Sequence, residues 1–297
     1  MLPQEVLQLI LSQTTVHPVR ILNHRFKDLF DRCNTALCIG HPSVTNTAYP
    51  SDIGNMISRV IDNSRALTSV TVRFVYRPSI MQFLPSLIKL TGLRTLICSD
   101  NILSFAGSLS FAPSLIMLTG LRTLELHNNF LGPDGAASLA PSLMRLTGLH
   151  TLNLSRNDLG PAGASSLTLS LPALTGLRTL NLRHNSFGPA GAASLAPSLM
   201  TLTGLQALDL SRNFMGPAGA SSLAPSLMML TGLQTLDLSK NDVGSDGALS
   251  LAPSLAILTG LQKLDLSYNS MGPEGALSFA SSLIWLTGLY TLNLSYN

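Results

Sequence analysis

One tetrapeptide, Leu-Thr-Gly-Leu, recurs at a constant interval of 28 residues through most of this 297-residue sequence. No insertion or deletion separates the copies, which begin at Leu90, Leu118, Leu146, Leu174, Leu202, Leu230, Leu258 and Leu286. Such a strict period means that one small structural unit is stacked many times, and that each unit buries its apolar face against its neighbours. The chain must therefore fold as an elongated solenoid.

Each unit predicts a short β-strand, a turn and a helix. Leu124 and Leu126 alternate with polar residues, as in a strand with one buried face, whereas residues 136–146 place apolar side chains at the three- and four-residue spacing of a helix. Parallel strands stack about 4.8 Å apart and packed helices about 8–10 Å apart, so the stack must curve with its strands inside. We expect an α/β fold, a right-handed horseshoe with a parallel concave β-sheet and convex helices.

The strand segments carry a recognisable motif. They read LRTLELHNN, LHTLNLSRN and LRTLNLRHN in three successive units, and N-x-x-G-x-x-G-A-x-x-L-A-x-x-L-x-x-L follows. With the 28-residue length, this pattern resembles the ribonuclease-inhibitor-like subfamily of leucine-rich repeats over residues 93–297. The resemblance implies a scaffold that binds a protein partner on its concave face. Regulation of a small GTPase, or an immune-receptor-like sensor fragment, is the alternative that the same subfamily implies.

An asparagine stands where each strand ends, at Asn101, Asn129, Asn157, Asn185, Asn213, Asn241, Asn269 and Asn297. A turning backbone loses its ladder partners there, and an amide side chain can serve both donors and acceptors. We predict a structural asparagine ladder rather than a binding site.

A proline recurs in the helical half, at Pro85, Pro113, Pro141, Pro197, Pro225 and Pro253. A proline inside a helix costs about 3 kcal/mol, so we expect each helix to begin at its proline, after a separate Gly-Ala turn. Leu169 and Ser281 replace the proline in two units, where longer helices are expected.

Residues 2–29 resemble a shortened F-box, with matches at Leu2, Pro3, Glu5, Val6, Leu7, Arg25, Phe26 and Leu29. An F-box implies a substrate receptor that links a target to a cullin-based ubiquitin ligase through an adaptor protein, with the repeats selecting the target. Because the middle of the motif is several residues short, a helical cap for the solenoid is the other interpretation.

The chain thus divides into a helical F-box-like or capping segment, a degenerate first repeat and the solenoid, at residues 1–50, 51–92 and 93–297. A loop is expected between Cys33 and Pro50, a helix over Ile53–Asn63 and a strand over Ser69–Phe74. The last unit stops after its strand without a polar cap, which predicts either a longer protein or end-to-end association.

Concave positions are the strand residues that are not leucine, so binding candidates form columns. The predicted partner-binding residues are Glu125, Arg156, His184, Asp209, Arg212, Asp237, Lys240, Asp265 and Tyr268. They include arginine and tyrosine, which are enriched in binding hot spots. On the helical side, Met229, Ile257 and Trp285 share one register and form either an exposed apolar stripe or contacts beneath neighbouring helices.

Several function classes lack their residues. Residues 93–297 carry nine Lys/Arg against ten Asp/Glu, without the sustained basic face that nucleic acid requires. There is no phosphate-binding glycine loop, paired metal motif or nucleophile with its base, which predicts no enzyme, cofactor or metal. No apolar stretch is long enough for a membrane span, so no membrane partner is expected. Three cysteines (Cys33, Cys38 and Cys98) favour a reducing location, cytoplasmic or nuclear.

Overall fold

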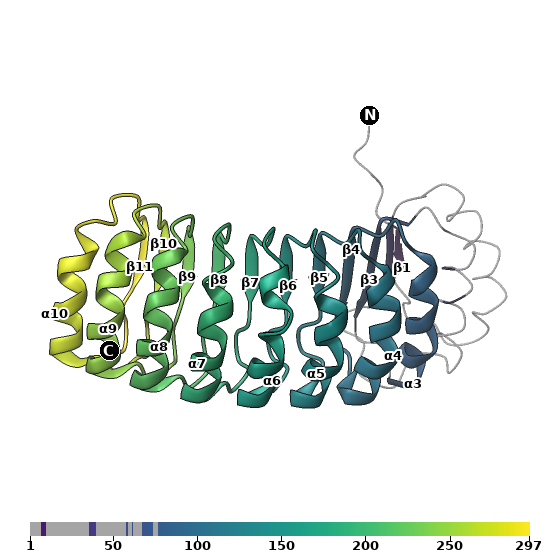
Figure 1. Cartoon of the computed structure of the whole chain (residues 1–297), viewed down its shortest axis with the longest axis horizontal. Coiled ribbons are helices and arrows are strands. Elements are labelled where there is room, and N and C mark those ends of the chain that lie inside the picture. Colours follow the sequence, from purple (N-terminus) through teal and green to yellow (C-terminus); the bar gives the residue numbers. More distant parts are fainter. Residues whose placement is uncertain (1–6, 10–35, 40–57, 59–60, 62–66, 74–76) are drawn as a thin grey trace.

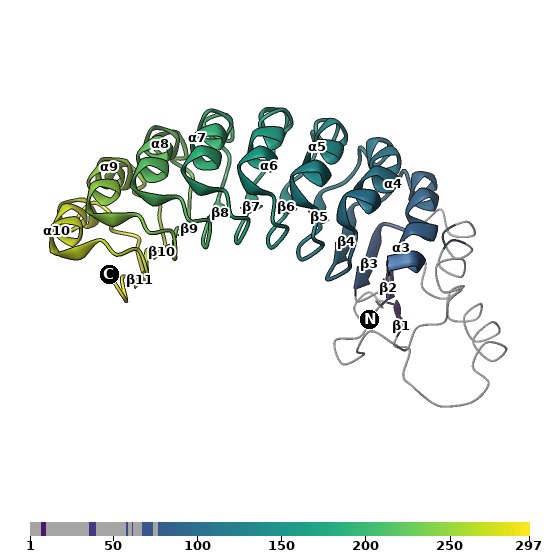
Figure 2. The same ribbon diagram turned by 90° about the horizontal axis from the view of Figure 1, so that it is seen from below.

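The computed structural model describes residues 7–9, 36–39, 58, 61, 67–73 and 77–297. Within this part of the chain, eleven parallel strands form one open sheet whose spatial order follows the sequence. Figure 1 shows a helix beside nearly every strand, and Figure 2 shows the strands lining the inside of an arc with the helices outside. The expected α/β solenoid with a concave parallel sheet and convex helices is confirmed.

Short strands alternate with longer helices. The strands are β1 (Leu7–Leu9), β2 (Ala36–Ile39), β3 (Ser69–Arg73), β4 (Thr95–Ser99), β5 (Thr123–Glu125), β6 (Thr151–Asn153), β7 (Thr179–Asn181), β8 (Ala207–Asp209), β9 (Thr235–Asp237), β10 (Lys263–Asp265) and β11 (Thr291–Asn293). The helices are α3 (Arg77–Phe83), α4 (Ser104–Met117), α5 (Gly132–Leu143), α6 (Gly160–Leu167), α7 (Gly188–Leu199), α8 (Gly216–Met229), α9 (Gly244–Ile257) and α10 (Gly272–Leu283), with 3-10 helices η1 (Leu84–Lys89) and η2 (Leu171–Ala173).

The leucines of successive repeats form one continuous core. Leu124 lies beside Leu152 in the strand register, one full repeat later, and both side chains are fully buried. Leu139 and Leu143 of α5 are buried against the same core. Each buried leucine contributes about 1.5–3 kcal/mol through removal of apolar surface from water, so packing between repeats drives the fold.

The asparagine column joins each repeat to the one before it. The Oδ1 atom of Asn157 accepts the backbone N–H of Asn129 at 2.9 Å, while its Nδ2 donates to the carbonyl oxygens of Leu126 and Leu154 at 2.9 and 3.0 Å. The link of Oδ1 to the preceding asparagine recurs in every repeat through Asn297. The amides therefore satisfy the backbone at the buried strand ends.

A second ladder, made by serines, runs through the helices. The hydroxyl of Ser226 in α8 donates to the carbonyl oxygen of Ala196 in α7 at 2.7 Å, and Ser254 repeats this contact with Ala224 one unit later. Equivalent bonds from Ser142 and Ser282 reach Ala112 and Ala252. These buried serines therefore link adjacent helices of the convex layer by hydrogen bonds, as the asparagines link adjacent repeats at the ends of the strands.

The proline expectation is wrong for five of the six positions. Pro113, Pro141, Pro197, Pro225 and Pro253 lie inside helices, and only Pro85 begins one, η1. Each helix instead starts at the preceding Gly-containing segment, often with its own proline at the first turn, as Pro133 does in α5. The interior prolines are all exposed, and so are the residues four positions earlier, whose carbonyls they leave free. Water can reach these residues, which lowers the cost of the missing hydrogen bond.

The two repeats without the interior proline do not have longer helices. The α6 helix, which precedes Leu169, spans only 8 residues, and α10, which contains Ser281, spans 12. Pro172 accounts for the shorter one, because proline has no N–H to donate to the carbonyl of Thr168, and the chain turns into η2 there.

The amino-terminal expectations are corrected at two places. Leu7–Leu9, expected to be helical in an F-box or cap, form strand β1, and Ala36–Ile39, expected to be a loop, form strand β2. Short apolar runs fit a strand as well as a helix. Here β2 pairs with β3, and β1 pairs with β2, so the sheet provides backbone hydrogen-bond partners for both segments. The other F-box-like residues (Leu2, Pro3, Glu5, Val6, Arg25, Phe26 and Leu29) lie outside the described residues.

Residues 69–89, within the segment predicted as a degenerate first repeat, contain a strand followed by helices. Ser69–Arg73 form β3 where a strand was expected, followed by α3 and η1. Ser58 and Ile61, the described residues of the expected helix over residues 53–63, are helical.

Candidate partner-binding surface

Three-residue strands set the geometry of the concave face. In β5 to β9 the middle residue is buried, while the residues on either side are partly exposed. The third residue of each strand therefore lies on the concave face, directly beside its counterpart in the next strand. This column holds Glu125, Asn153, Asn181, Asp209, Asp237 and Asp265.

The three aspartates of this column are held in one orientation. The Oδ1 atom of Asp237 accepts the backbone N–H and the hydroxyl of Ser239 at 2.9 and 2.7 Å. Asp209 makes the same pair of bonds with Ser211, and Asp265 makes it with Ser267. One oxygen of each carboxylate is therefore fixed by its own repeat, and the carboxylates cannot rotate freely.

The ionised form of Asp209 is disfavoured in this column. Burial raises the pKa of Asp209, and the neighbouring charge of Asp237 raises it further. The hydrogen bonds from Ser211 and the charge of Arg183 act in the opposite direction without cancelling the shift. Like charges on adjacent strands thus leave this part of the face electrostatically strained.

A cation and two aromatic rings stack just beyond the strand ends. The Nζ atom of Lys240 lies 4.1 Å from the ring centroid of Tyr268, and the Tyr268 and Tyr296 rings stack 4.3 Å apart with their planes 15° from parallel. Desolvation and then the nearby Tyr296 hydroxyl raise the pKa of Tyr268. Tyr268 is 41% exposed and Tyr296 is 73% exposed. The stack therefore presents an ordered but accessible aromatic surface.

The residues just beyond the strand ends form a second column, and their backbone is left-handed. Arg156, His184, Arg212, Lys240 and Tyr268 have φ values of 55–58°. A left-handed conformation costs a residue with a side chain about 1–2 kcal/mol relative to glycine. The turn thereby projects the same position of every repeat to the same edge of the sheet.

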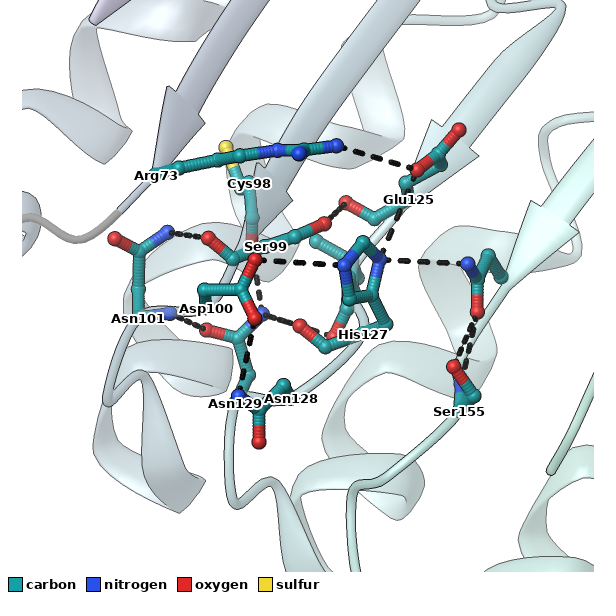
Figure 3. Close-up of polar contacts among 12 residues, drawn as sticks. Arg73, Cys98, Ser99, Asp100, Asn101, Glu125, His127, Asn128, Asn129 and Ser155 are labelled. Carbon is teal, nitrogen blue, oxygen red and sulfur yellow. Dashed lines mark hydrogen bonds and ion pairs between the residues drawn. The ribbon is translucent and has the colours of Figure 1, made fainter. Parts of the chain in front are cut away.

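A separate polar cluster lies over β3 to β6 (Figure 3). The guanidinium of Arg73 is 4.0 Å from the carboxylate of Glu125, and the His127 ring lies 3.7 Å from Glu125 and 3.5 Å from Asp100. Asn128 also donates to Asp100 at 3.0 Å. Glu125 is among the predicted partner-binding residues, and Asp100 and Asn128 occupy the position just past the strand that also holds Arg156. The available signal was His127, which occupies a position held by serine in most other repeats.

The structure divides the predicted binding residues into groups. Six of them lie side by side over β8 to β10, namely Asp209, Arg212, Asp237, Lys240, Asp265 and Tyr268. Glu125 belongs to the polar cluster of Figure 3 instead. Arg156 and His184 are exposed between the two groups. We call the six adjacent residues, with Tyr296, the β8–β10 surface.

The helical side carries an exposed apolar stripe. Met229, Ile257 and Trp285 are 46, 42 and 59% exposed, which favours the exposed alternative over packing beneath neighbouring helices. Met228 and Ile284 extend the stripe beside them.

The remaining candidate chemistry is limited in the described part of the chain. Burial raises the pKa of the free Cys98 thiol to about 12, which keeps it protonated and unreactive. Across the residues given above, no group of three or more metal-binding side chains occurs, and no helix is long and apolar enough to cross a membrane.

Comparison with known proteins agrees with this architecture, a curved solenoid of strand and helix units. A leucine-rich-repeat family model matches five segments spaced about one repeat apart, so these segments are leucine-rich repeats: residues 146–167, 174–196, 202–224, 231–252 and 259–280. The fold is similar to the crystal structure of an internalin from Listeria monocytogenes, with a TM-score of 0.50 and 18% identity, covering 91% of this chain and 82% of that one. No curated protein matches the sequence.

Proposed function

We propose that this protein is a non-catalytic scaffold that binds a protein partner on its concave face, mainly through the β8–β10 surface. The observation that carries the proposal is the ordered stack of Lys240, Tyr268 and Tyr296 beside three oriented aspartates. Side chains held before binding lose little conformational entropy on association, which favours affinity. Tyrosine is also among the residues that dominate measured binding energies.

The repeats are best assigned to the ribonuclease-inhibitor-like kind. Their 28-residue length and the helix in each unit from α4 to α10 support this assignment. It adds support for a protein as the partner, because helices on the convex side open the strands into a broad concave surface.

A binding experiment with matched variants tests the function. Partners captured from a cell lysate by the wild-type chain are compared with those captured by Lys240→Ala/Tyr268→Ala and by the helical-side control Arg145→Ala/Trp285→Ala. We expect the first variant to lose a specific partner, which the control retains, with both variants folded by circular dichroism. Loss of that partner only in the control would place binding on the convex stripe and contradict the proposal.

A further inference from the structure

Three arginines and one histidine form a row where strands β4 to β7 begin. Arg94, Arg122, His150 and Arg178 occupy the same repeat position, one residue before each strand. The next three copies of this position are the neutral residues Gln206, Gln234 and Gln262. We call the four residues the arginine row, and its charge stops where β8 begins.

Part of the row is anchored to the next repeat. The Nη1 atom of Arg94 donates to the carbonyl oxygen of Gly120 at 3.0 Å, and Arg122 makes the corresponding bond to Gly148 at 3.4 Å. The same nitrogen of Arg122 lies 3.4 Å from Nε2 of His150. A guanidinium has five N–H donors, so these bonds orient each arginine and still leave donors for a ligand.

The arginine row has no carboxylate partner within the described residues. The Arg73 guanidinium pairs with Glu125, and the His127 ring lies 3.5 Å from Asp100 and 3.7 Å from Glu125; no described carboxylate pairs with Arg94, Arg122 or Arg178. Glu125, the carboxylate on β5, is already paired with Arg73. Unpaired cations at adjacent repeats repel one another, and an anionic ligand would relieve this repulsion.

We propose that the arginine row binds an acidic segment of the partner protein, an inference that rests on the proposed function. Charge complementarity selects an anionic ligand, and Asp209, Asp237 and Asp265 limit its length, because they would repel a negative chain that continued past β7. A short acidic protein segment fits this limit, whereas a long nucleic acid carries uniform negative charge.

The test uses a fluorescent synthetic peptide of glutamate and glycine, measured by anisotropy against the full chain. Arg122→Gln/Arg178→Gln removes two charges and installs the residue that three other repeats carry at this position, so the fold should tolerate it. Arg145→Gln/Lys263→Gln removes the same charge elsewhere and serves as the matched control. We expect the first variant to bind roughly tenfold more weakly and the control to bind like the wild type.

A gain of binding provides the reverse test. Gln206→Arg/Gln234→Arg extends the row over β8 and β9 and should tighten binding of the glutamate peptide if the row is the contact. A matched lysine and glycine peptide should not bind the row, and raising the ionic strength from about 0.05 to 0.5 M should weaken the acidic complex strongly.

Defined outcomes overturn the proposal. Equal binding of the glutamate peptide by wild type and Arg122→Gln/Arg178→Gln would exclude the row as its site. Tighter binding of duplex DNA, lost in the same variant, would replace the acidic protein segment by nucleic acid. If the row fails these tests while Lys240→Ala/Tyr268→Ala still loses its captured partner, the scaffold function stands and this inference alone falls.

Discussion

Asn129 and Asn157 are joined across consecutive repeats, since the backbone N–H of Asn129 donates to Oδ1 of Asn157 at 2.9 Å. Asn157 also donates to two leucine carbonyls, all within a fully buried site. Asn157→Ala should therefore leave several buried polar groups without hydrogen-bond partners. We expect it to lower the free energy of unfolding by about 3 kcal/mol. Urea denaturation measures this change. Asn153→Ala, on the partly exposed concave face, is the control, and an equal loss in both variants would contradict the ladder's role.

Phe214 combines a left-handed backbone with an exposed ring, at φ 54° and 58% exposure. Asparagine adopts this conformation more readily, so Phe214→Asn should raise the free energy of unfolding by about 1 kcal/mol. Thermal and urea unfolding would report the gain. The buried Phe187→Asn should be strongly destabilising by contrast, and a destabilised Phe214→Asn would show that the ring makes contacts that offset its strain.

Asp209 predicts an unusual dependence of stability on pH. Because the pKa of Asp209 is raised in the folded state, folding disfavours its ionised form. The stability that Asp209 contributes is therefore present below the unfolded pKa and is lost as the pH rises through the folded pKa. Asp209→Asn removes that charge, and Asn153 already makes the same bonds to its serine. The variant should be more stable than the wild type at neutral pH. The difference should shrink below the unfolded carboxyl pKa of about 4. Stability curves at several pH values decide this, and a pH-independent difference would count against it.

Gly247 lies where α9 packs closely against α8. A Cβ added there would meet the Val243 side chain at 2.8 Å and the Ala220 Cβ at 3.0 Å. Gly247→Ala should therefore cost about 1–3 kcal/mol through overpacking. Gly92→Ala, where nothing lies within 4 Å of an added Cβ, is the control. A neutral Gly247→Ala in chemical denaturation would mean that adjacent helices shift freely.

Much of the fold could be predicted because the same residue types recur at the same positions of every repeat. The alternation around Leu124 and the asparagine at each strand end predict the sheet and its ladder directly from local chemistry. The serine ladder has the same period, but Ser226 donates to a carbonyl 30 residues earlier, which is not the equivalent position of the preceding repeat. The sequence pattern therefore does not predict this contact, and only the packing of the helices shows it.

The interior prolines and the polar cluster were harder to predict for a different reason. The cost of Pro141 depends on whether the carbonyl that it frees faces solvent, which the helix orientation decides. Arg73 and His127 come from different repeats and have no common spacing, so only the sheet register brings both to Glu125. The candidate surface over β8 to β10, by contrast, follows periodic columns that the sequence makes visible.

The bond between the third strand residue and the residue two positions later has an evolutionary consequence. Asn153, Asn181 and Asp237 all accept the same backbone N–H with Oδ1, although one of them is charged and two are not. Charge at this position can therefore be exchanged repeat by repeat while the backbone keeps its hydrogen bond. The scaffold can acquire a new specificity through single codon changes without losing this backbone hydrogen bond.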